Sequence, residues 1–397
     1  MDTTRLKESW RLVAAHGDQV PLYFYSSLFL THPQTREMFP VSMAGQRGKL
    51  VEALGHVVSN VDDLDTLVVF LGQLGRDHRK FAVVAEHYPA VGEALLATLE
   101  HFAGSAWTPQ LAADWGAAYG LVAKVMCDAA DESARTTPAW WDAEVIRHER
   151  RGLGLVVLTV RPHTRLDFVP GQSVAVETAL RPRMWRYFSP ANAPRADGTL
   201  EFHVRVVDGG SVSTALAQGI QAGDMLRLGA PVGQRLTLDG TGGRDVVLLA
   251  GGTGLAPFKA LIEHIKSEHD YGAIRRRAVV YAGARQTREL YDLPALEAYA
   301  QACEWLTVIP TVSEDPAYRG EIGEPVDVAL RHGPWGAHEV YLCGSPDLVT
   351  TGLAKLRSAG LPEERLHYEE FAGYAQPGQS PATANRSTEV SHESAAW

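Results

Sequence analysis

LLAGGTGLAP (Leu248–Pro257) is the stretch of sequence that decides the fold. It completes an apolar run, DVVLLA, typical of a buried strand, and leads into a helical pattern over 259–266. Alone, such a glycine cluster is often only a tight turn. Between a strand and a helix, it lets the backbone approach a phosphate at a helix N-terminus. This context predicts that a dinucleotide binds at Gly251, Gly252, Thr253 and Gly254.

The sequence beyond this turn repeats the same alternation. Apolar runs RAVVYAG, LTVIPT and EVYLCG alternate with helical patterns over 288–299 and 347–358. Repeated strand–helix units predict an α/β domain with a parallel sheet, which we place at residues 243–374. Residues 375–397 are rich in Pro, Gly, Ser, Thr and Ala, so we expect a disordered tail there.

Upstream of the turn, two further patterns follow one another. AEVIRHER, GLVVLTV, QSVAVET, LEFHVRVV and MLRLGAP alternate with period two, which predicts a small antiparallel β-barrel at residues 139–242. Residues 1–134 instead carry apolar residues at helical steps over 22–30, 50–61, 91–102 and 111–126. The expected fold is therefore multi-domain: an all-α domain, a linker at SARTTPAW (133–140), the barrel and the α/β domain.

Composition limits the functional classes. The chain of 397 residues is 45% hydrophobic and 21% charged, as expected for a protein with substantial cores, and its net charge of −10 disfavours nucleic acid as a partner. No apolar run reaches the ~20 residues of a membrane span, and the N-terminus lacks a signal-peptide pattern. Three scattered cysteines fit a reducing compartment. We expect a cytoplasmic protein; the oligomeric state stays open, with a monomer as the simplest expectation.

Two segments of the barrel suit a flavin. RYFS offers an arginine for a pyrophosphate, an aromatic ring for the isoalloxazine and a hydroxyl near its N5, at Arg186, Phe188 and Ser189. DGGSVSTAL (208–216) then offers backbone N–H groups and a helix start for phosphate. The plainer interpretations are a strand with a surface arginine and a turn before a capped helix.

One histidine of the helical domain follows the apolar stretch LVVFLGQLG. A haem in a helical domain needs a neutral imidazole on its iron, and His78 is suitably placed. For any one of fifteen histidines, a surface or satisfied core position is the commoner role. The aromatic residues of YFYSSLF, similarly, are each more commonly core residues.

The sequence of residues 1–134 resembles that of bacterial globins in four segments: YFYSSLFLTHPQTREMFP, GRDHRKF, EHYPAVGEALLATL and DWGAAYG. The resemblance implies that His78 is the proximal iron ligand, that Tyr25 and Gln46 face dioxygen, that Phe39 packs on the porphyrin and that Tyr88 lies on the proximal side. Two positions depart from the family: Ala130 stands where a glutamate is common, and Asp77 where a lysine is common.

Residues of the barrel and the α/β domain resemble the ferredoxin-reductase family, in PGQSVAV, RYFS, DGGSVS, LLAGGTGLAP and YLCGSPDLV. Phe188 replaces that family's usual tyrosine. The resemblance implies an FAD site and a nicotinamide site. Their residues would be Arg186, Tyr187, Phe188, Ser189, Gly210, Val212 and Ser213 for FAD, Cys343 and Gly344 beside the nicotinamide, and Phe371 over the flavin ring.

The three parts in this order resemble the flavohaemoglobin family. That resemblance implies haem b, FAD and NADH or NADPH as cofactors, and an enzyme that oxidises nitric oxide to nitrate with O2. Two alternatives stay open. One is a haem–flavin oxidoreductase with another electron donor or acceptor, and the other is a gas-binding sensor or carrier.

Overall fold

The computed structural model describes residues 1–272 and 274–369. The chain divides into two compact units, one over Met1–Trp140 and the other beginning at Trp141. The division falls at the end of the expected linker. Within the described residues, no helix is both long enough and apolar enough to cross a membrane. The expected tail at 375–397 lies outside the described residues.

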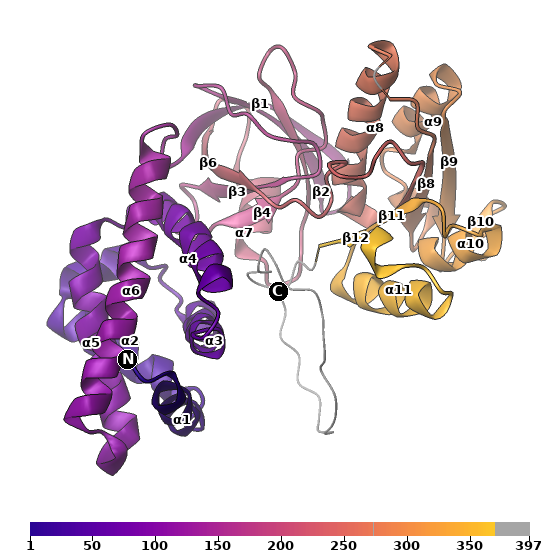
Figure 1. Ribbon diagram of the computed structural model, residues 1–397. Helices are drawn as coiled ribbons and strands as arrows, with labels where there is room; N and C mark the ends of the chain where they lie inside the picture. The colour runs from indigo at the N-terminus through magenta and orange to yellow at the C-terminus, as the bar shows by residue number, and fades with distance from the viewer. Residues whose placement is uncertain (273, 370–397) are drawn as a thin grey trace. The chain divides into compact units, whose positions relative to one another are not determined.

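The first unit is helical, as predicted (Figure 1). Its longest helix begins where the Thr108 side chain accepts a hydrogen bond from the Leu111 N–H, with Pro109 in the first turn. Short 3₁₀ turns join the helices. The α-helices are α1 (Thr3–Ala14), α2 (Gln19–Thr31), α3 (Ala44–Ser59), α4 (Leu64–His78), α5 (Tyr88–Ala103) and α6 (Pro109–Ala134).

Helices α4 and α6 approach each other very closely. A Cβ atom at Gly75 would lie 2.2 Å from the carbonyl oxygen of Met126, so only glycine permits this crossing. Leu67, Leu71 and Met126 form the buried cluster between the two helices. Because Gly75 is one turn before His78, the crossing fixes the end of α4, where the candidate iron ligand lies.

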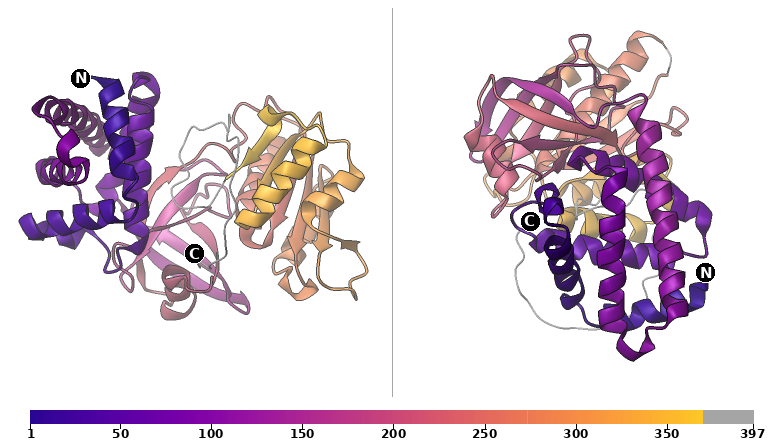
Figure 2. Two further views of the ribbon diagram at one scale, coloured as in Figure 1. Left: turned by 90° about the horizontal axis from the view of Figure 1, so that it is seen from below. Right: turned by 90° about the vertical axis from the view of Figure 1, so that its left-hand side faces the viewer.

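The second unit begins with an antiparallel sheet that is nearly closed into a barrel (Figure 2). Its strand order is β4-β3-β6-β1-β2-β5, and an isolated bridge between Pro190 and Phe202 joins the two edges. Buried residues alternate with more exposed ones over residues 141–145, as the period-two pattern predicted, whereas every residue of Ser173–Thr178 is buried. The strands are β1 (Trp141–Gly152), β2 (Leu155–Pro162), β3 (Ser173–Thr178), β4 (Arg186–Phe188), β5 (Leu200–Arg205) and β6 (Met225–Val232).

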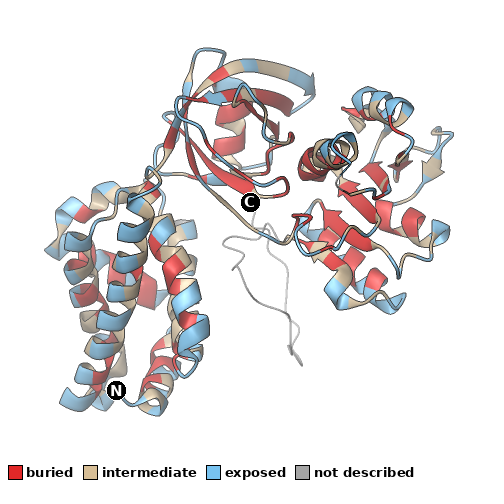
Figure 3. Cartoon of the chain, turned by 45° about the horizontal axis from the view of Figure 1, so that its top comes forward, coloured by how far each residue is buried: buried red, intermediate tan, exposed pale blue. Residues whose placement is uncertain are grey.

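The remaining described residues form a parallel sheet covered by helices on both faces, with the buried residues concentrated on its strands (Figure 3). In its strand Val246–Gly251, the side chains of Val246, Leu248 and Ala250 belong to the core on one face of the sheet. Val247 and Leu249 point to the other side and join the core on the opposite face. A strand buried on both faces needs an unbroken apolar run, which explains DVVLLA.

The order of the parallel strands is β10-β9-β8-β7-β11-β12. The elements are β7 (Val246–Gly251), α8 (Leu255–Asp270), β8 (Ala278–Ala284), α9 (Leu293–Ala302), β9 (Leu306–Val312), β10 (Glu321–Ile322), α10 (Pro325–His332), β11 (Glu339–Cys343), α11 (Pro346–Ser358) and β12 (Leu366–Tyr368). The predicted α/β domain is confirmed.

One predicted helix starts later than the sequence pattern indicated. The pattern placed a helix over 288–299, whereas α9 begins at Leu293 and has Pro294 in its first turn. Thr287–Glu289 is a 3₁₀ turn instead. The intervening residues, 290–292, line a pocket.

Candidate functional site

The predicted glycine turn lies where two neighbouring strands end. Strand β7 ends at Gly251, a single 3₁₀ turn covers Gly252–Gly254, and α8 follows directly. A Cβ atom at Gly254 would lie 2.2 Å from the Cys343 carbonyl oxygen at the end of β11. A Cβ atom at Gly344 would similarly lie 3.3 Å from the Cα of Gly251. The fold thus brings together two predicted motifs that are far apart in sequence.

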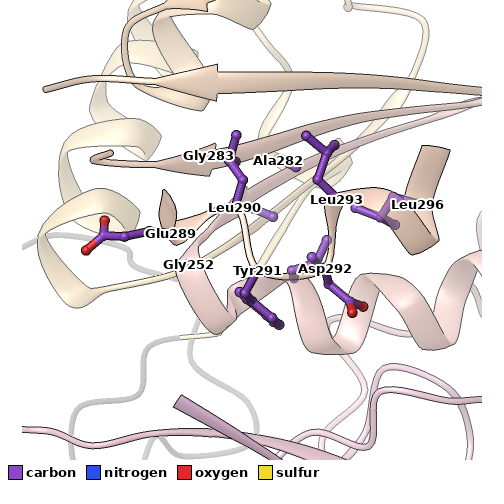
Figure 4. A pocket seen from close by; sticks show the side chains of 11 residues that line it. Gly252, Ala282, Gly283, Glu289, Leu290, Tyr291, Asp292, Leu293 and Leu296 are labelled. Carbon is purple, nitrogen blue, oxygen red and sulfur yellow. The ribbon is translucent and has the colours of Figure 1, made fainter. Parts of the chain in front are cut away.

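A pocket opens at the carboxyl ends of β7 and β8 (Figure 4). In a doubly covered parallel sheet, this edge is the usual ligand-binding edge. Its lining is mostly apolar, with glycines, alanines and four leucines, and it includes two acidic residues and one tyrosine, Glu289, Asp292 and Tyr291.

Arg205, at the end of β5, lies against this turn. Gly252 has φ +55°, and a Cβ atom there would be 3.8 Å from Nε of Arg205. The open turn, the start of α8 and a guanidinium are a suitable set for a pyrophosphate. The sequence pattern did not single out Arg205, because a β-strand arginine carries no local sign of a distant glycine turn.

The hydroxyl of Ser189 reaches a second group of polar residues. It is buried and lies 3.1 Å from the Ser173 hydroxyl, which donates to Oε2 of Glu369 at 3.3 Å. Burial raises the pKa of Glu369 to about 7, against the opposing effects of Ser173 and Arg235. Burial, and next the Glu369 charge, also raise the pKa of the Cys343 thiol. Ser189 and Cys343 were predicted, whereas Ser173 and Glu369 were missed.

The other predicted flavin residues lie on β4 and just after β5. Arg186 is exposed, with one guanidinium nitrogen donating to the Trp185 carbonyl at 2.9 Å, and Tyr187 follows it in β4. The half-buried Phe188 packs against the barrel core, its ring centre 6.4 Å from that of Phe202.

In the DGGSVS segment, the predicted helix start is a single turn, α7 (Ser211–Thr214). The Ser213 hydroxyl donates to the Gly210 carbonyl at 3.1 Å, which holds the turn together, while Val212 is 1% exposed and belongs to the barrel core. Phe371, expected over the flavin ring, lies outside the described residues.

His78 is the last residue of α4. Its Nδ1 lies 2.7 Å from the Leu74 carbonyl, which can only accept, so the proton is on Nδ1 and Nε2 keeps a free lone pair. Burial lowers the pKa of His78, which favours the neutral ring. A neutral imidazole with an oriented Nδ1–H is the form that binds a haem iron.

The predicted distal residues meet at one side of the first unit. Tyr25 in α2 is 6% exposed, and its hydroxyl lies 3.5 Å from the backbone carbonyl oxygen of Gln46 in α3. Its ring is 5.4 Å from that of Phe39 and 5.8 Å from that of Phe29. Burial raises the pKa of Tyr25 to about 12, so the phenol stays a hydrogen-bond donor at neutral pH.

Tyr88 begins α5 and packs into the same apolar cluster as Leu74, whose carbonyl orients His78. Burial raises the pKa of Tyr88 to about 12, with Cys127 as the second cause. Asp77 accepts from the Gln73 amide at 3.3 Å and lies 3.9 Å from the buried Lys80 ammonium. The unusual acid beside His78 is therefore partnered.

Arg79, next to His78, is fastened to the end of the helical unit. Its guanidinium donates to the Ser133 hydroxyl at 2.6 Å, to the Thr137 hydroxyl at 3.0 Å and to the Thr137 carbonyl at 2.6 Å. The residue beside the candidate iron ligand is thus tied to the segment that precedes Trp141.

The comparisons with known proteins agree with this architecture. Residues 22–126 match the globin family, residues 144–236 the oxidoreductase FAD-binding domain and residues 248–352 the oxidoreductase NAD-binding domain. A flavohemoprotein of Bacillus subtilis is 25% identical over 94% of this chain and 98% of its own length. A flavohemoprotein of Bordetella pertussis is 28% identical over 92% of this chain and 96% of its own length.

Solved structures show the same fold. A flavohemoglobin of Malassezia yamatoensis with bound FAD and haem superposes with a TM-score of 0.76 at 17% identity, over 93% of this chain and 98% of its own. An Amycolatopsis cytochrome P450 reductase superposes with a TM-score of 0.54 at 29% identity, over 59% of this chain and 71% of its own.

The chain is therefore a haem–flavin oxidoreductase in its architecture: a globin domain followed by FAD-binding and NAD-binding oxidoreductase domains. Its domain content and order are those of the flavohemoproteins to which it is similar, and its three domain types imply haem, FAD and a nicotinamide dinucleotide as cofactors. The residues present fit all three groups. The neutral imidazole of His78 would hold the haem. Arg186 and the hydrogen-bonded residues Ser189, Ser173 and Glu369 would contact the flavin. The glycine turn and Arg205 would hold the dinucleotide.

Proposed function

We propose that this protein is a nitric oxide dioxygenase, which converts nitric oxide and O2 to nitrate at the expense of NADH or NADPH. The carrying observation is the buried Tyr25 hydroxyl against Gln46, within an aromatic cluster of the globin domain. The haem supplies a site for dioxygen and the flavin converts hydride transfer into single-electron transfer. A solved Vibrio cholerae domain described as part of a nitric oxide dioxygenase shares the reductase fold, at 20% identity and a TM-score of 0.50.

In the globin domain, the proposed work of the chain is to hold and orient. His78 would carry the iron through Nε2, with its Nδ1–H fixed by Leu74. The Tyr25 phenol would donate a hydrogen bond to dioxygen at a bound haem, where the ligand accepts hydrogen bonds. The apolar rings of Phe29 and Phe39 keep water away from that donor.

In the reductase domains, the proposed roles are binding and proton handling. The glycine turn and Arg205 would hold the dinucleotide phosphates. Cys343 and Gly344 lie directly beside the glycine turn and would line the adjoining part of the site. Because the pKa of Glu369 is about 7, its carboxyl can hold a proton at neutral pH and share it through Ser173 with Ser189.

Stopped-flow spectroscopy of the full-length, haem- and FAD-loaded protein tests the proposal. Mixed with NADH, O2 and nitric oxide, it should consume nitric oxide rapidly, with stoichiometric nitrate and NADH oxidation. Flavin that is reduced while the haem stays ferric, with nitric oxide persisting, would refute the proposal.

A second candidate is electron delivery to another acceptor. The reductase domains are 29% identical to the P450 reductase and 26% to a ferredoxin reductase of a carbazole dioxygenase, at TM-scores of 0.54 and 0.53. Phe188, without the usual tyrosine hydroxyl, also lies in the expected flavin contact. Fast cytochrome c or ferricyanide reduction without nitric oxide consumption would favour this function.

The same proposal includes a cytoplasmic location. Cys127, Cys303 and Cys343 are all free thiols, as expected in a reducing compartment.

A further inference from the structure

The hydroxyl of Tyr291, a residue that lines the pocket, is hydrogen-bonded to the buried side chain of His203. Tyr291 lines the pocket, and its hydroxyl lies 2.7 Å from Nδ1 of His203, in strand β5 of the barrel. The His203 side chain is 0% exposed, and its Nε2 lies 3.0 Å from Oε1 of Glu201. An imidazole–carboxylate pair of one domain thus reaches the ligand-binding edge of the next.

Two further charges close this arrangement into a ring. The Lys259 ammonium lies 3.0 Å from Oε1 of Glu201 and 2.6 Å from Oδ2 of Asp292, the residue after Tyr291. Lys259 belongs to α8, the helix that starts at the glycine turn. The ring therefore fixes the pocket-lining segment to both β5 and α8.

The charge states fix the direction of each hydrogen bond. Burial opposes ionisation of Glu201, but the His203 hydrogen bond and the Lys259 charge prevail and lower its pKa to about 2. Burial lowers the pKa of His203, so the ring is neutral and has one N–H. An ionised Glu201 can only accept, which places the proton on Nε2 and leaves Nδ1 as an acceptor. The Tyr291 hydroxyl must then donate to Nδ1.

This direction leaves Tyr291 with only lone pairs to offer a ligand. Burial raises the pKa of Tyr291 well above its ordinary value, so the phenol keeps its one proton, which is engaged by His203. Glu289 in the same lining is also an acceptor group, whereas the Asp292 carboxylate is held by Lys259. Phosphate oxygens cannot satisfy such a lining, whereas hydroxyls can. The hydroxyl-bearing groups next to the phosphates of a dinucleotide are its riboses.

We propose that Tyr291 accepts a hydrogen bond from a ribose hydroxyl of the nicotinamide dinucleotide, and that His203 and Glu201 are positioning residues that set this polarity. The inference rests on dinucleotide binding in the proposed function. It adds a specificity group that the glycine motif does not contain.

The test is calorimetric titration of NAD⁺ into the full-length, haem- and FAD-loaded protein. Tyr291→Phe keeps the ring and removes the oxygen, and should raise the Kd about three- to tenfold, the usual worth of one hydrogen bond. His203→Ala should weaken binding similarly in the wild-type background and hardly at all in the Tyr291→Phe background. In steady state, KM for NADH should rise while flavin reduction at saturating NADH stays unchanged.

A matched control is available in the same domain. His367 and Glu339 form another histidine–glutamate pair, at 2.7 Å, in β12 and at the amino end of β11, the sheet edge opposite the pocket. His367→Ala should leave the Kd for NAD⁺ unchanged, and thermal melting with FAD content shows that each variant is folded.

The outcomes separate this inference from the proposed function. If wild type binds no NAD⁺ and oxidises no NADH, both fall. If wild type binds and Tyr291→Phe binds equally well, or if His203→Ala costs the same in both backgrounds, only the inference falls.

Discussion

The hydroxyl of Ser173 lies 3.3 Å from Oε2 of Glu369, although the two residues are 196 positions apart. Ser173 starts strand β3 of the barrel, and Glu369 follows the last strand of the parallel sheet. Together with the buried Ser189 they form a hydrogen-bonded group at the expected flavin site, in which the raised pKa of Glu369 favours a protonated carboxyl.

Glu369 should make stability depend on pH. Burial raises its pKa from 4.5 to about 7, so the folded state keeps a proton that the unfolded chain releases. The resulting stabilisation is complete below about pH 4.5 and is lost as the pH rises through about 7. In Glu369→Gln, the fall in melting temperature from pH 5 to pH 8 should become smaller.

Glu363→Gln is the control for that experiment. The Arg357 hydrogen bond lowers the pKa of this nearby glutamate, so it is already ionised across the whole range. An unchanged pH slope in Glu369→Gln would contradict the assignment of the titrating group.

His78→Ala should abolish stoichiometric haem binding while FAD remains, because no other group replaces the lone pair of Nε2. The ratio of haem to flavin absorbance in the purified protein measures this. His56→Ala, another half-buried histidine of the globin domain, should keep its haem. Full haem occupancy in His78→Ala would reassign the iron ligand.

Tyr25→Phe should speed the loss of dioxygen from the reduced protein about tenfold, because one buried donor is removed. Dioxygen replacement by carbon monoxide in stopped flow gives the rate. Tyr23→Phe, on the same helix but stacked on His101, should behave as wild type. Equal rates in both variants would remove Tyr25 from the site.

Gly254→Ala should destabilise the reductase domains by about 1–3 kcal/mol, since overpacking against fixed backbone forces strain. The added methyl would meet the Cys343 carbonyl at 2.2 Å. Gly336→Ala, where nothing lies within 4 Å, provides the comparison in urea unfolding followed by tryptophan fluorescence. Matching midpoints would show that the turn can move away from β11.

The sequence predicted the domain order and the kinds of element well, because helical and alternating apolar patterns are local. The antiparallel barrel and the parallel sheet are confirmed. Strands β10 and β12 were not predicted, since two or three residues are too short to show a period. The start of α9 was misplaced because a pocket-lining segment interrupts the helical pattern.

The site residues likewise divide into those that belong to local sequence motifs and those whose partners are distant in the sequence. Gly254 and Cys343 belong to motifs, and the structure brings them together. Ser173, Arg205 and Glu369 were missed because their partners come from distant parts of the chain. The roles of His78 and Tyr25 stay predictions that the experiments above address, and the role of Tyr88 also stays a prediction.

The hydrogen bonds from Arg79 to Ser133 and Thr137 bear on where a globin fragment of this chain should end. A fragment that stops at Ala134, the end of α6, would keep the hydrogen bond from Arg79 to Ser133 but lose both bonds to Thr137. We therefore expect a globin fragment that extends through Thr137 to hold the residue beside His78 more firmly than one that ends with α6. The short segment before Trp141 is therefore part of the helical unit's hydrogen-bonded structure and is more than a linker between the globin and the reductase domains.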